Sequence, residues 1–175
     1  LSDTWVDVLA NLNFASKKLA LQRSDAFLGG NALIDNGGDG RLLNLASTQI
    51  ALALASATTP LYTSADPYLG MTHSVALALR KIAALGATPL GLNFTLHYGH
   101  PEKYRDVCDL SESIRALGDA TKHWNIPILD GDISLGNGSE AYPLVPTPEI
   151  SMIGRADLNT SKTLNLFPEE GNLIF

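Results

Sequence analysis

The stretch from Asp66 to Glu102, DPYLGMTHSVALALRKIAALGATPLGLNFTLHYGHPE, predicts a helix, a turn, a buried strand and a loop. Asp66 is a good N-cap, and Pro67 suits the first helical position, where its missing N–H costs no hydrogen bond. Gly86 suits the C-terminal cap, and Thr88–Tyr98 then has the composition of an inner strand. Alanines fill most of the other helical faces, so we expect burial on more than one side. The apolar stripe of this helix repeats at Met71, Val75, Leu79 and Ile82.

Helical and strand patterns continue on both sides of this stretch. The further helices are predicted at Ser2–Asn11, Ser16–Asp25 and, half-exposed, from Glu102 to about Asn125. The further strands are predicted at Arg41–Ala46, Gln49–Ser56, Ile126–Leu129, Glu149–Gly154 and Asn172–Phe175. Polar loops are predicted at Ser56–Ala65 and Asp130–Ser139. This mixed order predicts an α+β fold, with a mixed or antiparallel sheet that carries the two long helices on one face.

Composition sets limits on the kind of protein. The chain has 175 residues, of which 45% are hydrophobic and 17% charged, as expected for one globular domain, residues 1–175. A net charge of −6 excludes the basic surface of a nucleic-acid-binding protein. No apolar run has the length of a membrane span, and we expect no membrane partner. Cys108 is the single cysteine, which excludes an internal disulfide and favours a cytoplasmic setting.

The ends of the chain suggest a piece of something larger. The sequence opens abruptly at Leu1 and stops at Phe175, within what reads as the beginning of a strand. We therefore expect a fragment of a larger enzyme, cut at a domain boundary.

The strongest local candidate for chemistry is the segment DGDIS, Asp130 to Ser134. Hard cations such as Mg²⁺ prefer oxygen ligands, and a glycine lets backbone N–H groups approach an anion. The segment is therefore a candidate magnesium and phosphate site, and an acidic turn with local hydrogen bonds is the alternative interpretation. His97 and His100 could form a metal pair, but two histidines are too few for a closed zinc site.

Several motifs carry a resemblance to a known family. The segments DPYLG (66–70), SVALALRKIAALGATPL (74–90) and LHYGHPEK (96–103) resemble the second half of phosphoribosylformylglycinamidine synthase. That half repeats the fold of the N-terminal domain of aminoimidazole ribonucleotide synthetase. The resemblance extends upstream to ASK (15–17), GN (30–31) and GGD (37–39), and downstream to PTP (146–148) before ISMIG.

The resemblance implies an activity. As a full-length protein, such an enzyme is an ATP-dependent ligase of purine biosynthesis. It converts formylglycinamide ribonucleotide and glutamine-derived ammonia to formylglycinamidine ribonucleotide, with ATP activating the amide oxygen. The implied cofactors are ATP and magnesium, and the implied partners are the ribonucleotide substrate and the other domains of the enzyme. The isolated fragment is expected to be inactive, and to form a homodimer through a sheet that packs on its equivalent in the family.

The resemblance also implies roles for individual residues. The family carries GNVS where this chain has Gly131-Asp132-Ile133-Ser134. The resemblance therefore implies that Gly131 contacts ATP, that Asp132 binds the metal ion, and that Ser134 contacts the ribonucleotide substrate. Asp132 replaces an asparagine and keeps a metal-ligating oxygen. The family's catalytic histidine belongs to its first half, so no catalytic residue is assigned here.

Two departures from the family favour another interpretation. Phe94 stands where the family has an aspartate that contacts ATP, and Ser56-Ala57-Thr58-Thr59 replaces a segment with Thr-Asp. Phenylalanine cannot ligate a metal ion or accept a hydrogen bond. One alternative is therefore a structural half-domain whose nucleotide site has decayed. A further alternative is a different member of the same superfamily, such as aminoimidazole ribonucleotide synthetase or thiamine-phosphate kinase. The segments YGHPEK (98–103) and PTP (146–148) argue against it, since both fit the first family better.

Overall fold

The computed structural model describes residues 2–11, 15, 40–139 and 142–159. Its helices are α1 (Ser2–Ala10), α3 (Pro60–Ala65), α4 (Pro67–Ala84) and α5 (Tyr104–His123). Its strands are β1 (Arg41–Asn44), β2 (Ile50–Thr58), β3 (Thr88–His97), β4 (Ile128–Ser134) and β5 (Thr147–Asp157). The helix predicted at Ser16–Asp25, the glycines at 37 and 38 and the strand predicted at Asn172–Phe175 lie outside the described residues.

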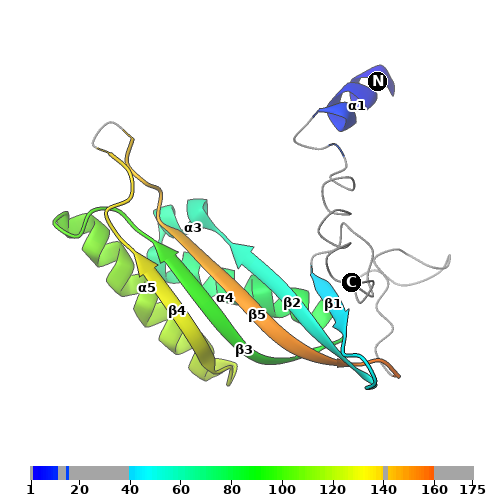
Figure 1. Cartoon of the computed structure of the whole chain (residues 1–175). Helices are drawn as coiled ribbons and strands as arrows, with labels where there is room; N and C mark the ends of the chain where they lie inside the picture. Colours follow the sequence, from blue (N-terminus) through cyan, green and yellow to red (C-terminus); the bar gives the residue numbers. More distant parts are fainter. Residues whose placement is uncertain (1, 12–14, 16–39, 140–141, 160–175) are drawn as a thin grey trace.

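The five described strands form one mixed sheet in the order β1-β2-β5-β3-β4. All neighbouring pairs are antiparallel except β3 and β4, which run parallel. Helices α3, α4 and α5 lie on one face of this sheet, and the opposite face has no described element on it (Figure 1). The predicted α+β class, with helices on one face, is confirmed. In the described part of the chain, no helix combines the length and the apolar run that crossing a membrane requires.

Helix α4 forms where the sequence predicts it. The carboxylate of Asp66 accepts a hydrogen bond from the Leu69 backbone N–H at 2.9 Å, and Pro67 occupies the first turn. The helix ends at Ala84, and Gly86 follows with a φ of +66°, which glycine adopts without strain. The N-terminal and C-terminal signals of α4 are therefore both read correctly from the sequence.

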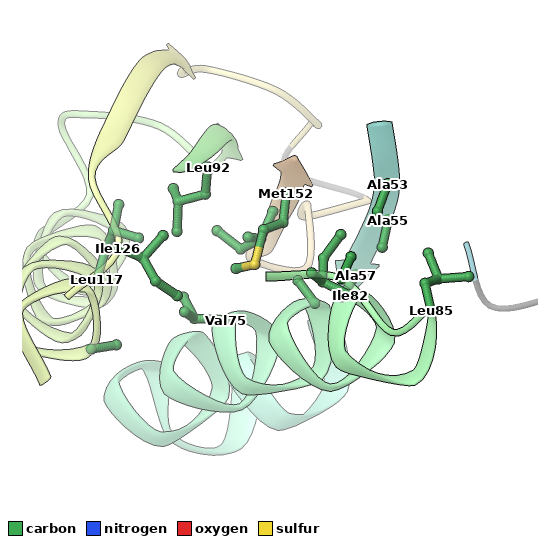
Figure 2. Close-up of a cluster of buried hydrophobic side chains, with 14 of the residues drawn as sticks. Ala53, Ala55, Ala57, Val75, Ile82, Leu85, Leu92, Leu117, Ile126 and Met152 are labelled. Atoms are coloured by element: carbon green, nitrogen blue, oxygen red, sulfur yellow. The ribbon is translucent and has the colours of Figure 1, made fainter. Parts of the chain in front are cut away.

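Helix α4 packs closely on the sheet because the facing side chains are small. Strand β2 turns alternate alanines toward the helix, and Ala53, Ala55 and Ala57 are buried beside it (Figure 2). At Gly154 of β5, a Cβ atom would lie 2.8 Å from Cγ2 of Ile82, so only glycine admits the isoleucine at this distance. The core then fills with larger side chains from α4, β3 and β5: Met71, Val75, Ile82, Leu92, Leu96, Ile150 and Met152.

Helix α5 packs against α4 rather than along the whole sheet. The Tyr68 hydroxyl donates a hydrogen bond to Asp119 at 3.1 Å, and the Arg115 guanidinium lies 4.2 Å from the centre of the Tyr68 ring. Helix α5 is also tied to the end of β3, because the buried Tyr98 hydroxyl donates a hydrogen bond to Ser113 Oγ. Cys108 lies on α5 and is half-buried.

The predictions of two loops are partly wrong, because each segment contains regular secondary structure. The segment Ser56–Ala65 contains the end of β2 and the whole of α3, because Pro60 begins a helical turn. Hydroxyl groups of this segment are buried and paired: Thr59 Oγ1 lies 2.6 Å from Ser74 Oγ, and Thr63 Oγ1 donates to the Thr59 carbonyl. These tertiary hydrogen bonds satisfy polar side chains that, read locally, indicate a loop.

The other error concerns Asp130–Ser134, which the sequence places in a loop. These five residues belong to β4 and pair in parallel with Asn93–His97 of β3. Pairing with an already formed strand outweighs the turn preference of an Asp-Gly-Asp sequence, which acts only locally.

Replacing Asp66 by alanine tests the cap of α4. The Asp66→Ala variant should lose about 1 kcal/mol of unfolding free energy, because the Leu69 N–H loses its acceptor. Asp66→Asn is the matched control and should stay close to the unchanged protein, since the amide oxygen caps equally well. Urea unfolding measures both, and an equal loss in the two variants would contradict the capping role.

Candidate functional site

The candidate site lies on the open face of the sheet. In a strand, alternate side chains point to the same face, so Asp130, Asp132 and Ser134 share one face of β4. Their partners in β3 are Asn93, Thr95 and His97. Both aspartates are exposed, and Ser134 is half-buried. The structure therefore brings two of the predicted ligands, Asp132 and Ser134, to one surface.

Polar side chains continue across this face in rows set by the strand register. One row runs from Asp132 through Thr95 to Glu149. The next runs from Ser134 through His97 to Thr147. A hollow of about 490 Å³ adjoins these rows over β2, β3 and β5; its polar lining residues are Arg41, Ser56, Asn93 and Ser151. The face thus offers oxygen and nitrogen groups rather than the uniformly apolar surface of a sheet that is buried on both sides.

Packing against Phe94 leaves no room for a side chain at Gly131. Gly131 pairs with Phe94 across the parallel strands, and a Cβ atom at position 131 would lie 2.1 Å from Cζ of Phe94. The Phe94 ring packs against the core on the helix side, so Gly131 lies beneath the ring, while Asp132 points to the open face. The ring of Phe94 therefore occupies the space that a side chain at position 131 of the neighbouring strand β4 would need.

The loop after β4 folds back on Ser134. Asn137 Nδ2 donates to the Ser134 carbonyl at 3.1 Å and to the Ser134 hydroxyl oxygen at 2.9 Å. Gly136 and Gly138 flank Asn137 with φ values of +74° and +96°, which allow the tight turn. The Gly136 N–H donates to the Gly99 carbonyl at 2.8 Å, which links this loop to the one after β3. Sequence reasoning missed Asn137, although the Gly-Asn-Gly pattern is a turn signal.

The same two loops enclose a cavity of about 470 Å³ beside the site. The Asp106 carboxylate accepts the His100 backbone N–H at 2.7 Å, and a Cβ atom at Gly99 would lie 2.1 Å from Asp106 Oδ2. Asp106 therefore holds the loop after β3 against the first turn of α5. The polar side chains that line the cavity are His100, Glu102, Lys103, Asp106, Asn137 and Ser139.

The two histidines near the site lie in different surroundings. His97 stands in the row with Ser134 on the open face, whereas His100 lines the cavity and its Nδ1 accepts the Glu102 N–H at 3.3 Å. Among the residues the structure describes, no three His, Cys, Asp or Glu side chains gather closely enough to hold a metal ion. A cation at Asp132 would therefore need further ligands from water or a substrate.

Tyr98 anchors the end of β3 beside the site. Its side chain is fully buried, and its backbone N–H donates to the Ser134 carbonyl at 3.0 Å. Burial raises the pKa of the Tyr98 hydroxyl to about 12, so this group stays neutral and serves as a hydrogen-bond partner of Ser113. Burial also raises the pKa of the nearby Asp109 carboxyl, and the Arg105 charge opposes that rise.

Comparison with known proteins places the chain in a family. Residues 37–156 match the model of the AIR synthase related protein, N-terminal domain. The chain therefore belongs to the AIR synthase related family, and the matched range contains the whole site described above.

The curated relatives of the chain belong to one kind of enzyme within this family. The chain is 35% identical over 156 residues to the phosphoribosylformylglycinamidine synthase subunit PurL of Bartonella bacilliformis, covering 89% of this chain and 21% of the relative. It thus spans about a fifth of the length of the curated relatives it matches. The resemblance seen in the sequence motifs is confirmed.

Solved structures show the same fold. PurL of Thermotoga maritima complexed with FGAR superposes with a TM-score of 0.73 at 22% identity, over 84% of this chain and 24% of that one. The same protein complexed with ATP gives a TM-score of 0.71 at 23% identity, over 81% and 24%. Thiamine monophosphate kinase of Aquifex aeolicus gives 0.53 at 14% identity, over 81% and 44%. At these identities the likeness establishes the fold alone.

The contact between Phe94 and Gly131 can be tested by stability. Gly131→Ala should lose about 1 kcal/mol of unfolding free energy, because the new methyl group forces the Phe94 ring away from its rotamer. In a Phe94→Ala background the same substitution should cost nothing, since the ring is gone.

Gly118→Ala is the matched control for this experiment. A Cβ atom at Gly118 of α5 meets nothing within 4 Å, so alanine there should stabilise the helix by roughly 0.5–1 kcal/mol. Guanidinium unfolding of the four variants gives the coupling. An unchanged stability of Gly131→Ala in the otherwise native chain would show that Phe94 does not require the glycine.

Proposed function

We propose that this chain is a domain of a phosphoribosylformylglycinamidine synthase. The whole enzyme would be an ATP-dependent C–N ligase of purine biosynthesis that amidates formylglycinamide ribonucleotide with glutamine-derived ammonia. The observation that carries the proposal is the 35% identity to a PurL subunit over 89% of this chain. The likeness in fold to PurL complexed with ATP and with FGAR supports it.

The proposed ligand residues lie together at the edge strand β4. Asp132 would contribute a carboxylate to Mg²⁺, Gly131 a backbone N–H to ATP, and Ser134 its hydroxyl to the ribonucleotide. Strand β4 is the last strand of the described sheet, so its outer edge has no described strand beside it. Some of its backbone N–H groups are therefore available to an anionic ligand.

The open face fits a magnesium ion that is held mostly by its substrate. Mg²⁺ is usually bound through one or two protein carboxylates together with water and phosphate oxygens. Asp132 is exposed, and Asp130 lies two residues away on the same face. Bound magnesium would neutralise phosphate charge, and this chain's own contribution would be to orient the phosphates and the ribonucleotide on a rigid sheet.

The short length of this chain relative to PurL indicates that its partners are other domains of the same enzyme. Because the chain spans 21% of its PurL relative, the other domains would supply the catalytic histidine and the ammonia. We propose that one of these domains covers the open face of the sheet. The enzyme would work in the cytoplasm, in keeping with the single cysteine of this chain.

One observation favours a second candidate function. Phe94 fills the position at which the family has an ATP-contacting aspartate, and its ring lies over Gly131. A domain with a decayed nucleotide site would still hold the other half of the enzyme in place. Nucleotide binding at this half distinguishes the two proposals, since the structural domain would bind none. Thiamine monophosphate kinase of Aquifex aeolicus shares the fold at 14% identity, and no observation favours its function for this chain.

Replacing Asp132 tests the proposed site in the complete enzyme. Asp132→Ala should reduce ATP-dependent amidation at least tenfold and raise the magnesium concentration needed for half-maximal rate, because a ligand oxygen is lost. The melting temperature should not change, since the side chain is exposed. Asp132→Asn is the control and should retain most activity, because it keeps an oxygen ligand. Full activity of Asp132→Ala throughout a magnesium titration would contradict the proposed site and favour a structural domain with a decayed nucleotide site.

The chain by itself should be inactive and self-associated. It supplies about a fifth of the length of its relatives, and its open sheet face includes the apolar side chains of Leu52, Leu54 and Ile153 beside the polar rows. Sedimentation of the purified chain at micromolar concentration should show a dimer or larger species, and ATP hydrolysis should not respond to formylglycinamide ribonucleotide. A monomer, or substrate-dependent hydrolysis, would contradict this prediction.

A further inference from the structure

The side chain of Asn137 has a single orientation that satisfies its surroundings. Its amide lies 3.1 Å from the Ser134 carbonyl oxygen, which can only accept a hydrogen bond. The amide atom facing that carbonyl must therefore be the nitrogen. The second hydrogen of the same nitrogen is then directed to the Ser134 hydroxyl oxygen, at 2.9 Å.

This arrangement determines what the Ser134 hydroxyl can do. A hydroxyl group has one hydrogen to donate and two lone pairs that accept. Asn137 occupies a lone pair of Ser134 Oγ, and this is the one hydrogen bond of that oxygen among the described residues. The hydroxyl hydrogen thus remains for a ligand on the open face.

The loop that carries Asn137 is held from several directions. Gly136 is bonded to Gly99, and beyond Asn137 a bridge joins Gly138 to Pro143. The Ser134 carbonyl also accepts the Tyr98 N–H, so both of its lone pairs have donors. The Asn137 side chain is therefore held beside Ser134 before any ligand arrives, which lowers the entropic cost of binding.

We propose that Asn137 is a positioning residue that makes Ser134 a hydrogen-bond donor, so that the group recognised there is an acceptor oxygen such as that of a phosphate. The inference rests on the proposed function for the identity of the substrate. It adds to that function which partner donates the hydrogen bond: Ser134 donates, and the ligand accepts. An uncharged ligand group that offers only N–H donors would find one remaining lone pair on Ser134 Oγ but would leave the hydroxyl hydrogen without an acceptor, so it should bind less well than a group with an acceptor oxygen.

The test reverses the polarity of Asn137 in the full-length protein. The carboxylate of an Asn137→Asp variant can only accept, so it would take the Ser134 hydroxyl hydrogen and repel the Ser134 carbonyl oxygen. Calorimetry should show dissociation constants at least about tenfold higher than those of the unchanged protein for formylglycinamide ribonucleotide and inorganic phosphate. Ser134→Ala should show a similar loss. In steady-state kinetics KM should rise more than kcat falls.

Two controls separate positioning from charge and from folding. Asn125→Asp adds the same charge before the other end of β4, at an exposed residue, and should leave both constants unchanged. In a Ser134→Ala background, Asn137→Asp should weaken binding much less than in the native background, because the hydroxyl it acts through is absent. A purely structural role would instead give additive losses and a lower melting temperature.

The possible outcomes distinguish failure of the inference from failure of the proposed function. Amidation by the unchanged protein together with native-like binding of both probes by Asn137→Asp would overturn the inference and leave the proposed function standing. Phosphate binding that depends on Ser134 and Asn137, without amidation, would support the inference and overturn the proposed function. Absence of binding and of amidation in the unchanged protein would overturn both.

Discussion

The close packing of α4 on the sheet is the constraint on which the rest of this structure depends. Alanines on β2 and a glycine on β5 leave too little bulk for the sheet to bury its helix face in any other way. The helix must approach until Ile82 lies against Gly154, and Met71 and Val75 then join the larger side chains of β3 and β5 in one buried cluster. Because dense packing is lost if either partner grows, the small residues and the helix depend on each other.

This packing leaves the opposite face of the sheet without a described element on it, and the proposed site lies on that face. With α3, α4 and α5 on one side, the alternation of each strand directs every second side chain to the other side. Strand register then sets Asp132 beside Thr95, and Ser134 beside His97, in rows that cross three strands. A rigid sheet keeps such groups at fixed separations, which suits a site that binds and orients phosphate-bearing ligands.

The glycines of the candidate site have different structural roles. Gly131 accommodates the Phe94 ring, and Gly136 and Gly138 form the turn that brings Asn137 onto Ser134. Packing thus accounts for the missing side chain at Gly131, and this leaves its backbone free to contact a ligand. The same position can serve both purposes because the ring lies on the helix side of β4, whereas the proposed ligands lie on the open face and at the edge.

The sequence by itself determined the elements whose signals are local. Asp66, Pro67 and Gly86 mark the ends of α4, and the alternation along β2, β3 and β5 marks the strands, because caps and periodicity act within a few residues. It also determined the family, through the motifs between positions 15 and 154. Only the tertiary structure decided that Asp130–Ser134 is a strand, that Pro60–Ala65 is a helix, and that Phe94 faces Gly131. The strand and the Phe94 contact depend on pairing between β3 and β4, which are separated by the whole of α5, and α3 depends on burial against α4. Such contacts leave no periodic signal in the residues themselves.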